Sequence, residues 1–394
     1  MPGVVFLALD RSAWGGDQSQ YGRASVELYA AFRQSPAVWL SRLFDVFPSK
    51  PNGLVWIGQL FVPLGLAFGS IDRALLSSVV LLQVLTLVIL FAAVAGSSAR
   101  GVWTALVACL VVGSAPAFVH WGHQYLVEPL QVLSVSWFIF IASRAPRWPR
   151  ALVVFQLLAA TALALCAKGS QPLFCLAPGL LALSSVLRPR STEPLRVGRP
   201  ALAATAVFAV LLGAVTAVWY VRNFGAVREH VRASAFGLGV RTFWGKEDTY
   251  LHTIVYWLGA VRQEFFHPFL FGLALLLGAA AVARRRAGSD RVERRLTALF
   301  VASILQIVLV VLVFASSPAR VPRYLLPLLP YLAIVVAWCV ERIGRTRISV
   351  AVAAAFTLQL VWAQSLEISR LFPLEQYVKS RVVLDAIVAR SCAP

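Results

Sequence analysis

Long apolar runs separated by short polar connectors make up most of the chain. Ten such runs lie at approximately 74–95, 101–119, 126–143, 151–167, 172–187, 200–220, 268–283, 296–315, 324–340 and 348–366. A helix of roughly 20 apolar residues crosses a bilayer, and these runs approach that length with few charges. The pattern predicts an all-α polytopic membrane protein with about ten full spans, in which residues 1–394 form a single integral membrane domain.

The connectors between the runs differ in arginine content. Four of them are strongly basic, at 144–150, 188–199, 284–295 and 342–347. Strict alternation of the spans places all four on the same side, and the positive-inside rule assigns that side to the cytoplasm. We therefore expect a multi-pass protein of the plasma membrane.

The opposite, extracytoplasmic side then carries two large loops. The first is residues 10–73, and the second is residues 221–267. Within the first, the apolar stretch 54–68 is short and interrupted by Gly58, Pro63 and Gly65. Such a stretch is more typical of an interfacial helix than of a membrane span.

The first nine residues are apolar but too short to cross a bilayer. They also lack the basic segment and the cleavage site of a signal peptide. The sequence therefore predicts a truncated or missing first span, or a short helix that dips into the outer leaflet.

Composition excludes a soluble domain, because 59% of the residues are hydrophobic and only 13% are charged. The formal net charge of +19 comes from arginines that fall mostly in the connectors, so it indicates topology and not nucleic-acid binding. The five cysteines show no CxxC spacing, which indicates neither a disulfide framework nor a cysteine-based zinc site.

Two acids stand at the outer ends of apolar segments, where the membrane penalises them. Asp17 lies in a polar, glycine-containing stretch at 13–21, and it is either a functional carboxylate or the cap of a following helix. Glu128 precedes Pro129 after a turn that holds His120 and His123. It is either a functional acid or an acid placed favourably at a helix N-terminus.

Three cations occupy the same predicted side. Lys168 lies in a minimal turn, where it either reaches lipid headgroups or presents a point charge to a phosphate. Arg320 and Arg323 open a later span, and guanidinium groups suit a phosphate or an anionic lipid. Cations that hold a lipid phosphate and an acid that takes a proton from a hydroxyl would together serve a group transfer.

Five segments, taken in order, resemble a known family. They are Gly16–Tyr21, Lys50–Leu54, Glu128–Pro129, Ala167–Gly169 and Arg323–Pro327. Their motifs are similar to those of the GT-C-fold glycosyltransferases that use polyprenyl-phosphate sugars, including protein O-mannosyltransferases and aminoarabinose transferases. The resemblance covers nearly the whole chain, although Gln18 stands where the first motif has a second acid.

The resemblance implies a GT-C-like helical bundle and transfer of a sugar from a polyprenyl-phosphate donor to an extracytoplasmic glycan, lipid or protein acceptor. In it Asp17 is the general base and Glu128 a second acid that positions the acceptor or a divalent metal ion. The expected donor-phosphate ligands are Lys168, Arg320, Arg323 and Tyr324. The expected acceptor or lid residues are Tyr21, His123, Arg222 and Asn223, and the candidate metal ligands are Asp17, Glu128 and His123.

Two alternatives from other classes stay open at this point. A transporter or flippase of lipid-linked precursors would carry ionisable residues near the bilayer midplane, whereas these spans are nearly free of charge at their centres. A non-catalytic GT-C remnant would fit Gln18 and the short first segment.

Overall fold

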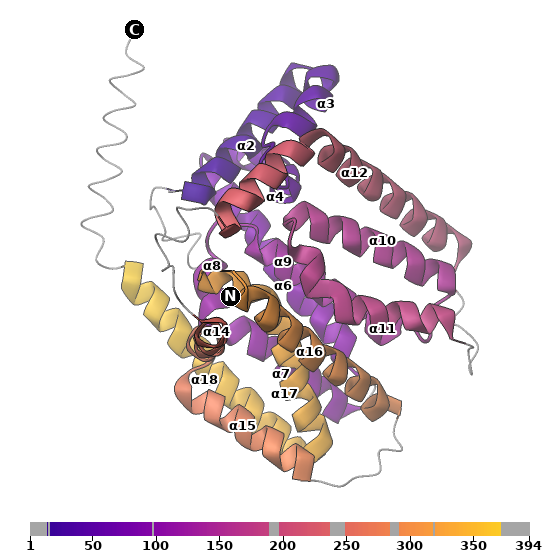
Figure 1. Cartoon of the computed structure of the whole chain (residues 1–394), viewed down its shortest axis with the longest axis vertical. Coiled ribbons are helices and arrows are strands. Elements are labelled where there is room, and N and C mark those ends of the chain that lie inside the picture. Colours follow the sequence, from indigo (N-terminus) through magenta and orange to yellow (C-terminus); the bar gives the residue numbers. More distant parts are fainter. Residues whose placement is uncertain are drawn as a thin grey trace.

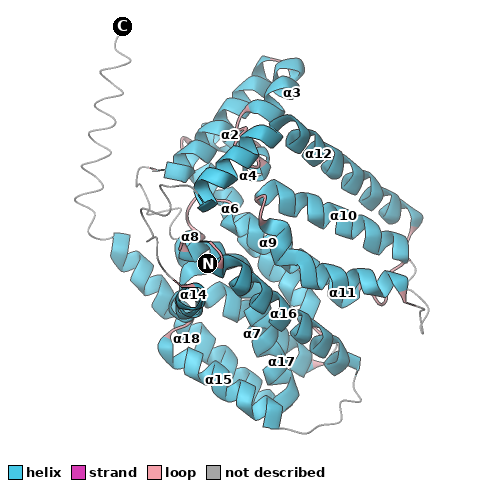
Figure 2. Ribbon diagram, viewed as in Figure 1, coloured by secondary structure: helices cyan, strands magenta, loops and turns pink. Residues whose placement is uncertain are grey.

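The computed structural model describes residues 14, 16–96, 98–188, 197–236, 249–283, 291–317 and 320–371. Every regular element within these ranges is helical (Figures 1 and 2). The elements are α2 (Gly16–Gln34), α3 (Pro36–Asp45), α4 (Gly53–Gly58), α5 (Val62–Phe68), α6 (Ile71–Val94), α7 (Ala99–Ser114), α8 (Pro116–Trp121), α9 (Glu128–Arg144), α10 (Arg150–Ala167), η1 (Gln171–Cys175), α11 (Leu176–Leu187), α12 (Arg199–Phe236), α14 (Tyr250–Phe265), α15 (Pro268–Ala283), α16 (Arg291–Ala315), η2 (Pro322–Leu328), α17 (Leu329–Ile343) and α18 (Thr346–Leu371).

Local sequence signals set several helix ends. Ser70 caps α6 by accepting a hydrogen bond from the Arg73 amide, and Ser98 caps α7 by accepting one from the Gly101 amide. Gly344 ends α17 with a φ of 70°, a left-handed conformation that glycine adopts without steric cost. These signals fix where the chain turns between packed helices.

The predicted count of ten spans is not confirmed. Six helices in the described ranges are long and apolar enough to cross a membrane, and α14 with α15 makes a seventh if this pair, bent by 108°, counts as one span. The predicted spans at 101–119 and 126–143 correspond to α7 and α9, which have 16 and 17 residues. At 1.5 Å per residue these helices are about 25 Å long, less than the roughly 30 Å hydrocarbon core.

Apolar helix faces pack into a layered bundle. Helix α9 packs on α6 and α10, α7 packs on α17 and α18, and α10 packs on α12. The main core is buried among α7, α9, α16 and α17. A smaller core joins α2 and α4 to α6 and to the start of α9. This smaller core holds the N-terminal helices against the rest of the bundle (Figure 1).

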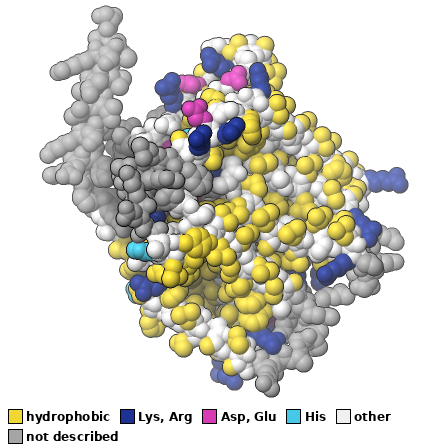
Figure 3. Space-filling view, viewed as in Figure 1, with side chains coloured by type: hydrophobic (Ala, Val, Ile, Leu, Met, Phe, Trp, Pro, Cys, Tyr) yellow, Lys and Arg dark blue, Asp and Glu magenta, His cyan; other side chains and the backbone are white. Residues whose placement is uncertain are grey.

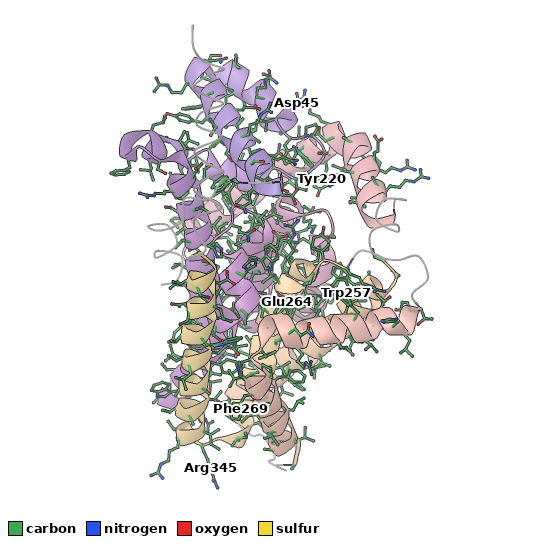
Figure 4. All side chains as sticks on the ribbon, turned by 90° about the vertical axis from the view of Figure 1, so that its left-hand side faces the viewer. Asp45, Tyr220, Trp257, Glu264, Phe269 and Arg345 are labelled. Atoms are coloured by element: carbon green, nitrogen blue, oxygen red, sulfur yellow. The ribbon has the colours of Figure 1, made fainter. Side chains whose placement is uncertain are left out.

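Both segments predicted as large outer loops are mostly helical where the structure describes them. Residues 16–68 form four helices, α2 to α5. In the second segment α12 continues to Phe236 and α14 begins at Tyr250. Figure 4 shows Trp257 and Glu264 on α14, which runs across the view. It also shows Phe269 on α15, which runs in a different direction from α14. Residues 1–9, for which the sequence predicts a truncated or missing first span or a short helix that dips into the outer leaflet, lie outside the described residues.

The surface is that of an integral membrane protein. Apolar side chains cover the middle of the face in Figure 3, over α10, α11 and α16, while charged side chains gather toward its edges. Asp45 and Arg345, from segments predicted to face opposite sides of the membrane, lie toward opposite ends of the long axis in Figure 4. Which end faces the cytoplasm stays a prediction from the basic connectors.

Gly53, at the start of α4, provides a test of how the smaller core packs. A Cβ atom there would lie 2.6 Å from the carbonyl oxygen of Cys166 in α10, and backbone cannot move aside cheaply. We expect Gly53→Ala to lower the melting temperature in detergent, by a destabilisation of about 1–3 kcal/mol typical of overpacking. Gly225→Ala is the control, because a Cβ there meets nothing within 4 Å. Equal melting temperatures for the two variants would contradict this packing.

Candidate functional site

Asp17 lies in the first turn of α2 and receives two charge-assisted hydrogen bonds. Lys50 Nζ donates to Oδ1 at 2.6 Å, and Arg323 Nη2 donates to Oδ2 at 2.7 Å. The Asp17 side chain is 33% exposed, so it stays reachable from outside the bundle. Helix α2 begins at Gly16, so Asp17 lies inside its first turn, where an acid suits the helix dipole, and not at the predicted cap position. However, both cations come from elements remote in sequence, which a cap alone does not explain.

Arg323 also reaches the second acid. Its Nε atom lies 3.3 Å from Oε1 of Glu128, which opens α9. Glu128 is only 2% exposed. Its other oxygen, Oε2, is buried and makes no hydrogen bond to any part of the chain that the structure describes. A buried carboxylate oxygen normally has a partner, so this atom marks a place for a ligand group or water.

Lys168 follows α10 directly and completes the cluster. Its Nζ atom lies 3.6 Å from the centre of the Tyr324 ring, and the guanidinium of Arg323 lies over the same ring at 5.8 Å. Burial lowers the pKa of Lys168 to about 8, against the opposing effect of the Glu128 carboxylate. An ammonium beside an aromatic face is attracted to the ring but keeps donors for an anion.

Charge balance favours an anionic ligand. The cluster of Asp17, Glu128, Lys50, Lys168 and Arg323 combines two carboxylates with three cations. Burial raises the pKa of Asp17, but hydrogen bonds and charges from Lys50 and Arg323 outweigh it and hold the pKa below its ordinary value. Asp17 is therefore ionised at neutral pH. The positive excess is available to a phosphate.

The turn between α8 and α9 fixes the two acids relative to each other. Tyr125 shares a hydrogen bond of 2.8 Å with Ser25 of α2 and donates to the Leu54 carbonyl of α4 at 3.1 Å. In the same turn Gln124 accepts from Gln18 at 3.1 Å. Gln18, which replaces the second acid of the motif, thus ties α2 to the turn that leads into Glu128.

Of the remaining predicted phosphate and acceptor residues, Tyr21 adjoins the cluster, whereas the others contact residues outside it. Arg320 lies over the ring of Tyr256 in α14, at 5.3 Å. Tyr21 is buried below Lys50, whose Nζ lies 5.7 Å from the ring centre. Arg222 and Asn223 both contact Phe44 at the end of α3: Arg222 lies over the ring, and Asn223 donates to the carbonyl.

The structure groups His123 with residues other than the two acids. His123 lies with His120 and Glu367, and one potential ligand atom from each falls within 4.8 Å of the others. Among the described residues, these three side chains form the group whose ligand atoms lie close enough together to hold a metal ion. The predicted grouping of Asp17, Glu128 and His123 does not form. Both oxygens of Asp17 instead face protein cations.

Lys50 is a site residue that the sequence analysis did not assign. Its contact with Asp17 spans 33 positions of sequence, so no local pattern predicts it. One signal was present, because Lys50 opens the second segment of the family resemblance. It is also one of only four lysines in the chain. A lysine that rare in an arginine-rich protein points to a specific contact.

Comparison with known proteins rests on structure. No protein-family model matches the sequence, and no curated protein matches it. Two crystal structures of ArnT from Cupriavidus metallidurans superpose on it, one in the apo state and one bound to undecaprenyl phosphate, with TM-scores of 0.56 and 0.58. The chain has the ArnT fold. Sequence identity is 19% in both superpositions, which cover 89% and 90% of this chain.

The shared fold confirms the GT-C resemblance at the level of architecture. The superposed region takes in 61% and 62% of the ArnT chains, so this chain spans about three fifths of their length. Nearly all of the present chain thus has a structural counterpart in the longer ArnT chain.

The position of Lys168 predicts a pH-dependent stability. Its pKa of about 8 in the folded protein lies below the value of roughly 10.4 in an unfolded chain. Between these values the unfolded state binds more protons, so this lysine makes stability rise with pH from about 8 to 10. We expect the melting temperature of the wild type to rise relative to that of Lys168→Gln across this range. Parallel curves for the two proteins would contradict a buried, titrating lysine.

Proposed function

We propose that the protein is a membrane glycosyltransferase that moves a sugar from a polyprenyl-phosphate donor to an extracytoplasmic acceptor. The observation that carries the proposal is the bridge from Arg323 to both Asp17 and Glu128, at 2.7 and 3.3 Å. The ArnT fold supports it, and so does the binding of undecaprenyl phosphate by ArnT itself. We infer a location in the plasma membrane with the site on the outer side, as the basic connectors favour.

The cations of the cluster are the proposed donor ligands. Transfer of a sugar from a polyprenyl phosphate breaks the bond between the anomeric carbon and the phosphate oxygen, so negative charge grows on the departing phosphate. Lys168 and Arg323 adjoin the same Tyr324 ring, which supports a shared role in stabilising that charge. Arg320 lies shortly before Arg323 in the chain and over the Tyr256 ring, and it is the proposed third ligand.

Asp17 is the proposed general base. An acceptor hydroxyl must lose its proton as its oxygen attacks the anomeric carbon, and an ionised carboxylate accepts that proton. Exposure favours Asp17 over Glu128, because the Asp17 side chain is 33% exposed and that of Glu128 is 2% exposed. Lys50 and Arg323 orient the carboxylate and keep it ionised. Glu128 holds Arg323, and its buried Oε2 is available to orient an acceptor group.

These assignments need no metal ion at the two acids. Lys50 and Arg323 already supply a positive charge to each oxygen of Asp17, and Arg323 supplies one to Glu128. A divalent cation between the acids would have to displace these partners. The donor set therefore fits cationic side chains better than it fits a metal.

Replacing Asp17 tests the base. Asp17→Asn keeps the side-chain volume but removes the basic oxygen, so we expect transfer to fall by about 10²–10⁴-fold. The measurement is release of polyprenyl phosphate from a panel of labelled polyprenyl-phosphate hexoses and pentoses, with membrane extracts as acceptor source. Asp45→Asn is the matched control, because this exposed acid lies at the far end of α3. Wild-type rates in Asp17→Asn would exclude the assignment.

The same assay separates the proposal from the two alternatives. A flippase would move labelled lipid between leaflets of a vesicle without releasing polyprenyl phosphate. A non-catalytic remnant would do neither with any donor of the panel. Release of polyprenyl phosphate that depends on Asp17 is expected from the enzyme alone.

Donor binding tests the cations separately from catalysis. We expect Lys168→Gln and Arg323→Gln to weaken binding of undecaprenyl phosphate by about 10- to 150-fold, since each loses a charge-assisted hydrogen bond worth roughly 1.5–3 kcal/mol. Binding is measured with radiolabelled undecaprenyl phosphate and purified protein in nanodiscs. Arg222→Gln is the control, because Arg222 is exposed and contacts Phe44. Unchanged affinity in both site variants would mean that these cations only stabilise the bundle.

A further inference from the structure

A second polar cluster lies next to the proposed site and is not used by it. His120 and His123 come from the end of α8 and the turn after it, and Glu367 comes from the last turns of α18. His120 Nδ1 lies 2.9 Å from Glu367 Oε2. The two histidine rings meet edge to face, with 5.6 Å between their centres. Three side chains of metal-binding type thus converge from two segments separated by more than 200 residues.

A carboxylate at the position of Glu367 carries a free-energy penalty. Glu367 belongs to a helix that qualifies as a membrane span over Thr346–Ser369, and it is only 6% exposed. An acid at such a position requires a positive or hydrogen-bonded partner, and it usually marks a functional site. His120 is one such partner, and a divalent cation held by the same side chains would be another.

The hydrogen bonding of His123 prepares its ring for a metal. Its Nδ1 atom lies 2.9 Å from the carbonyl oxygen of Val119. A carbonyl has no proton to give, so Nδ1 carries the hydrogen and donates it. In the neutral ring the lone pair is then on Nε2. Metal-ligating histidines are commonly oriented in this way, with the other nitrogen donating to a backbone carbonyl.

The spacing of the ligand atoms suits a small ion. One potential ligand atom from each residue lies within 4.8 Å of the other two. Two ligands at 2.0–2.1 Å from one zinc ion, in tetrahedral geometry, are roughly 3.3 Å apart. Rotation of the histidine and glutamate side chains can bring the ligand atoms from their present separation to the one that a zinc ion requires. Two imidazoles with one carboxylate are a ligand set that zinc accepts, with a water molecule as the fourth ligand.

We propose that His120, His123 and Glu367 bind a zinc ion that joins the outer end of α18 to the turn before α9. The site lies beside the glycosyl-transfer cluster through Trp121. The His120 ring meets the Trp121 ring edge to face at 4.5 Å, and the Arg323 guanidinium lies over Trp121 at 5.7 Å. The ion would hold this turn, and with it Trp121, in place. Binding of the ion does not depend on the proposed function.

Metal content is the direct test. Full-length protein without a histidine tag is purified in detergent, stripped with a chelator, loaded with zinc chloride and desalted. We expect about one zinc ion per chain by mass spectrometry of the metal. Glu367→Gln and His123→Gln are expected to weaken zinc binding at least tenfold in a competition titration. His252→Gln is the matched control, because this histidine is exposed on α14. Size-exclusion profiles show whether each variant is folded.

Two further readouts separate a metal site from a simple ion pair. Cobalt(II) in place of zinc should give the visible absorption bands of a tetrahedral site in the wild type and lose them in His123→Gln. Added zinc should raise the melting temperature of the wild type, because it binds the folded state, but not that of Glu367→Gln. Less than a tenth of an equivalent of zinc in folded wild type, or equal zinc affinity in all variants, would overturn the proposal. Neither result would bear on sugar transfer.

Discussion

A single guanidinium group holds the candidate site together. Arg323 contacts Asp17, which lies 306 positions earlier, and Glu128 at the start of α9. Two carboxylates so near each other in a partly buried setting repel unless a cation lies between them. The cation between them is a side chain of η2, so α2, α9 and η2 meet at one place. Removing it would leave Glu128 as a buried, unpaired charge, which is strongly unfavourable.

The packing around this bridge gives each end of the site a separate anchor. The smaller core and Tyr125 hold α2, which carries Asp17, and α4, which begins shortly after Lys50. The main core holds η2, which carries Arg323, and α17, which follows η2 directly. Lys168 directly follows the end of α10. Gly53 has no side chain, and this lets α4 pack closely against Cys166 at that end of α10. Rigid helices thus place charged groups that the membrane would otherwise exclude.

Apolar periodicity and length were enough to predict the fold class, because a bilayer imposes them on any spanning helix. They were not enough to count spans, since α7 and α9 are short and α14 bends sharply into α15. Asp17, Glu128, Lys168 and Arg323 stood out as charges at the ends of apolar runs. The contact from Lys50 to Asp17 and the separation of His123 from the acids depend on tertiary packing, which no local pattern encodes.

The proposed function requires the cluster around Arg323 to receive a lipid phosphate. A cryo-EM structure of the protein in nanodiscs, enlarged with a bound antibody fragment and saturated with undecaprenyl phosphate, tests it most directly. We expect a phosphate within hydrogen-bonding distance of Lys168 Nζ or the Arg323 guanidinium, with the prenyl chain leaving between helices and Asp17 still open to the outside. A phosphate bound away from both cations, with the Arg323 bridge between Asp17 and Glu128 unchanged, would contradict the proposed function.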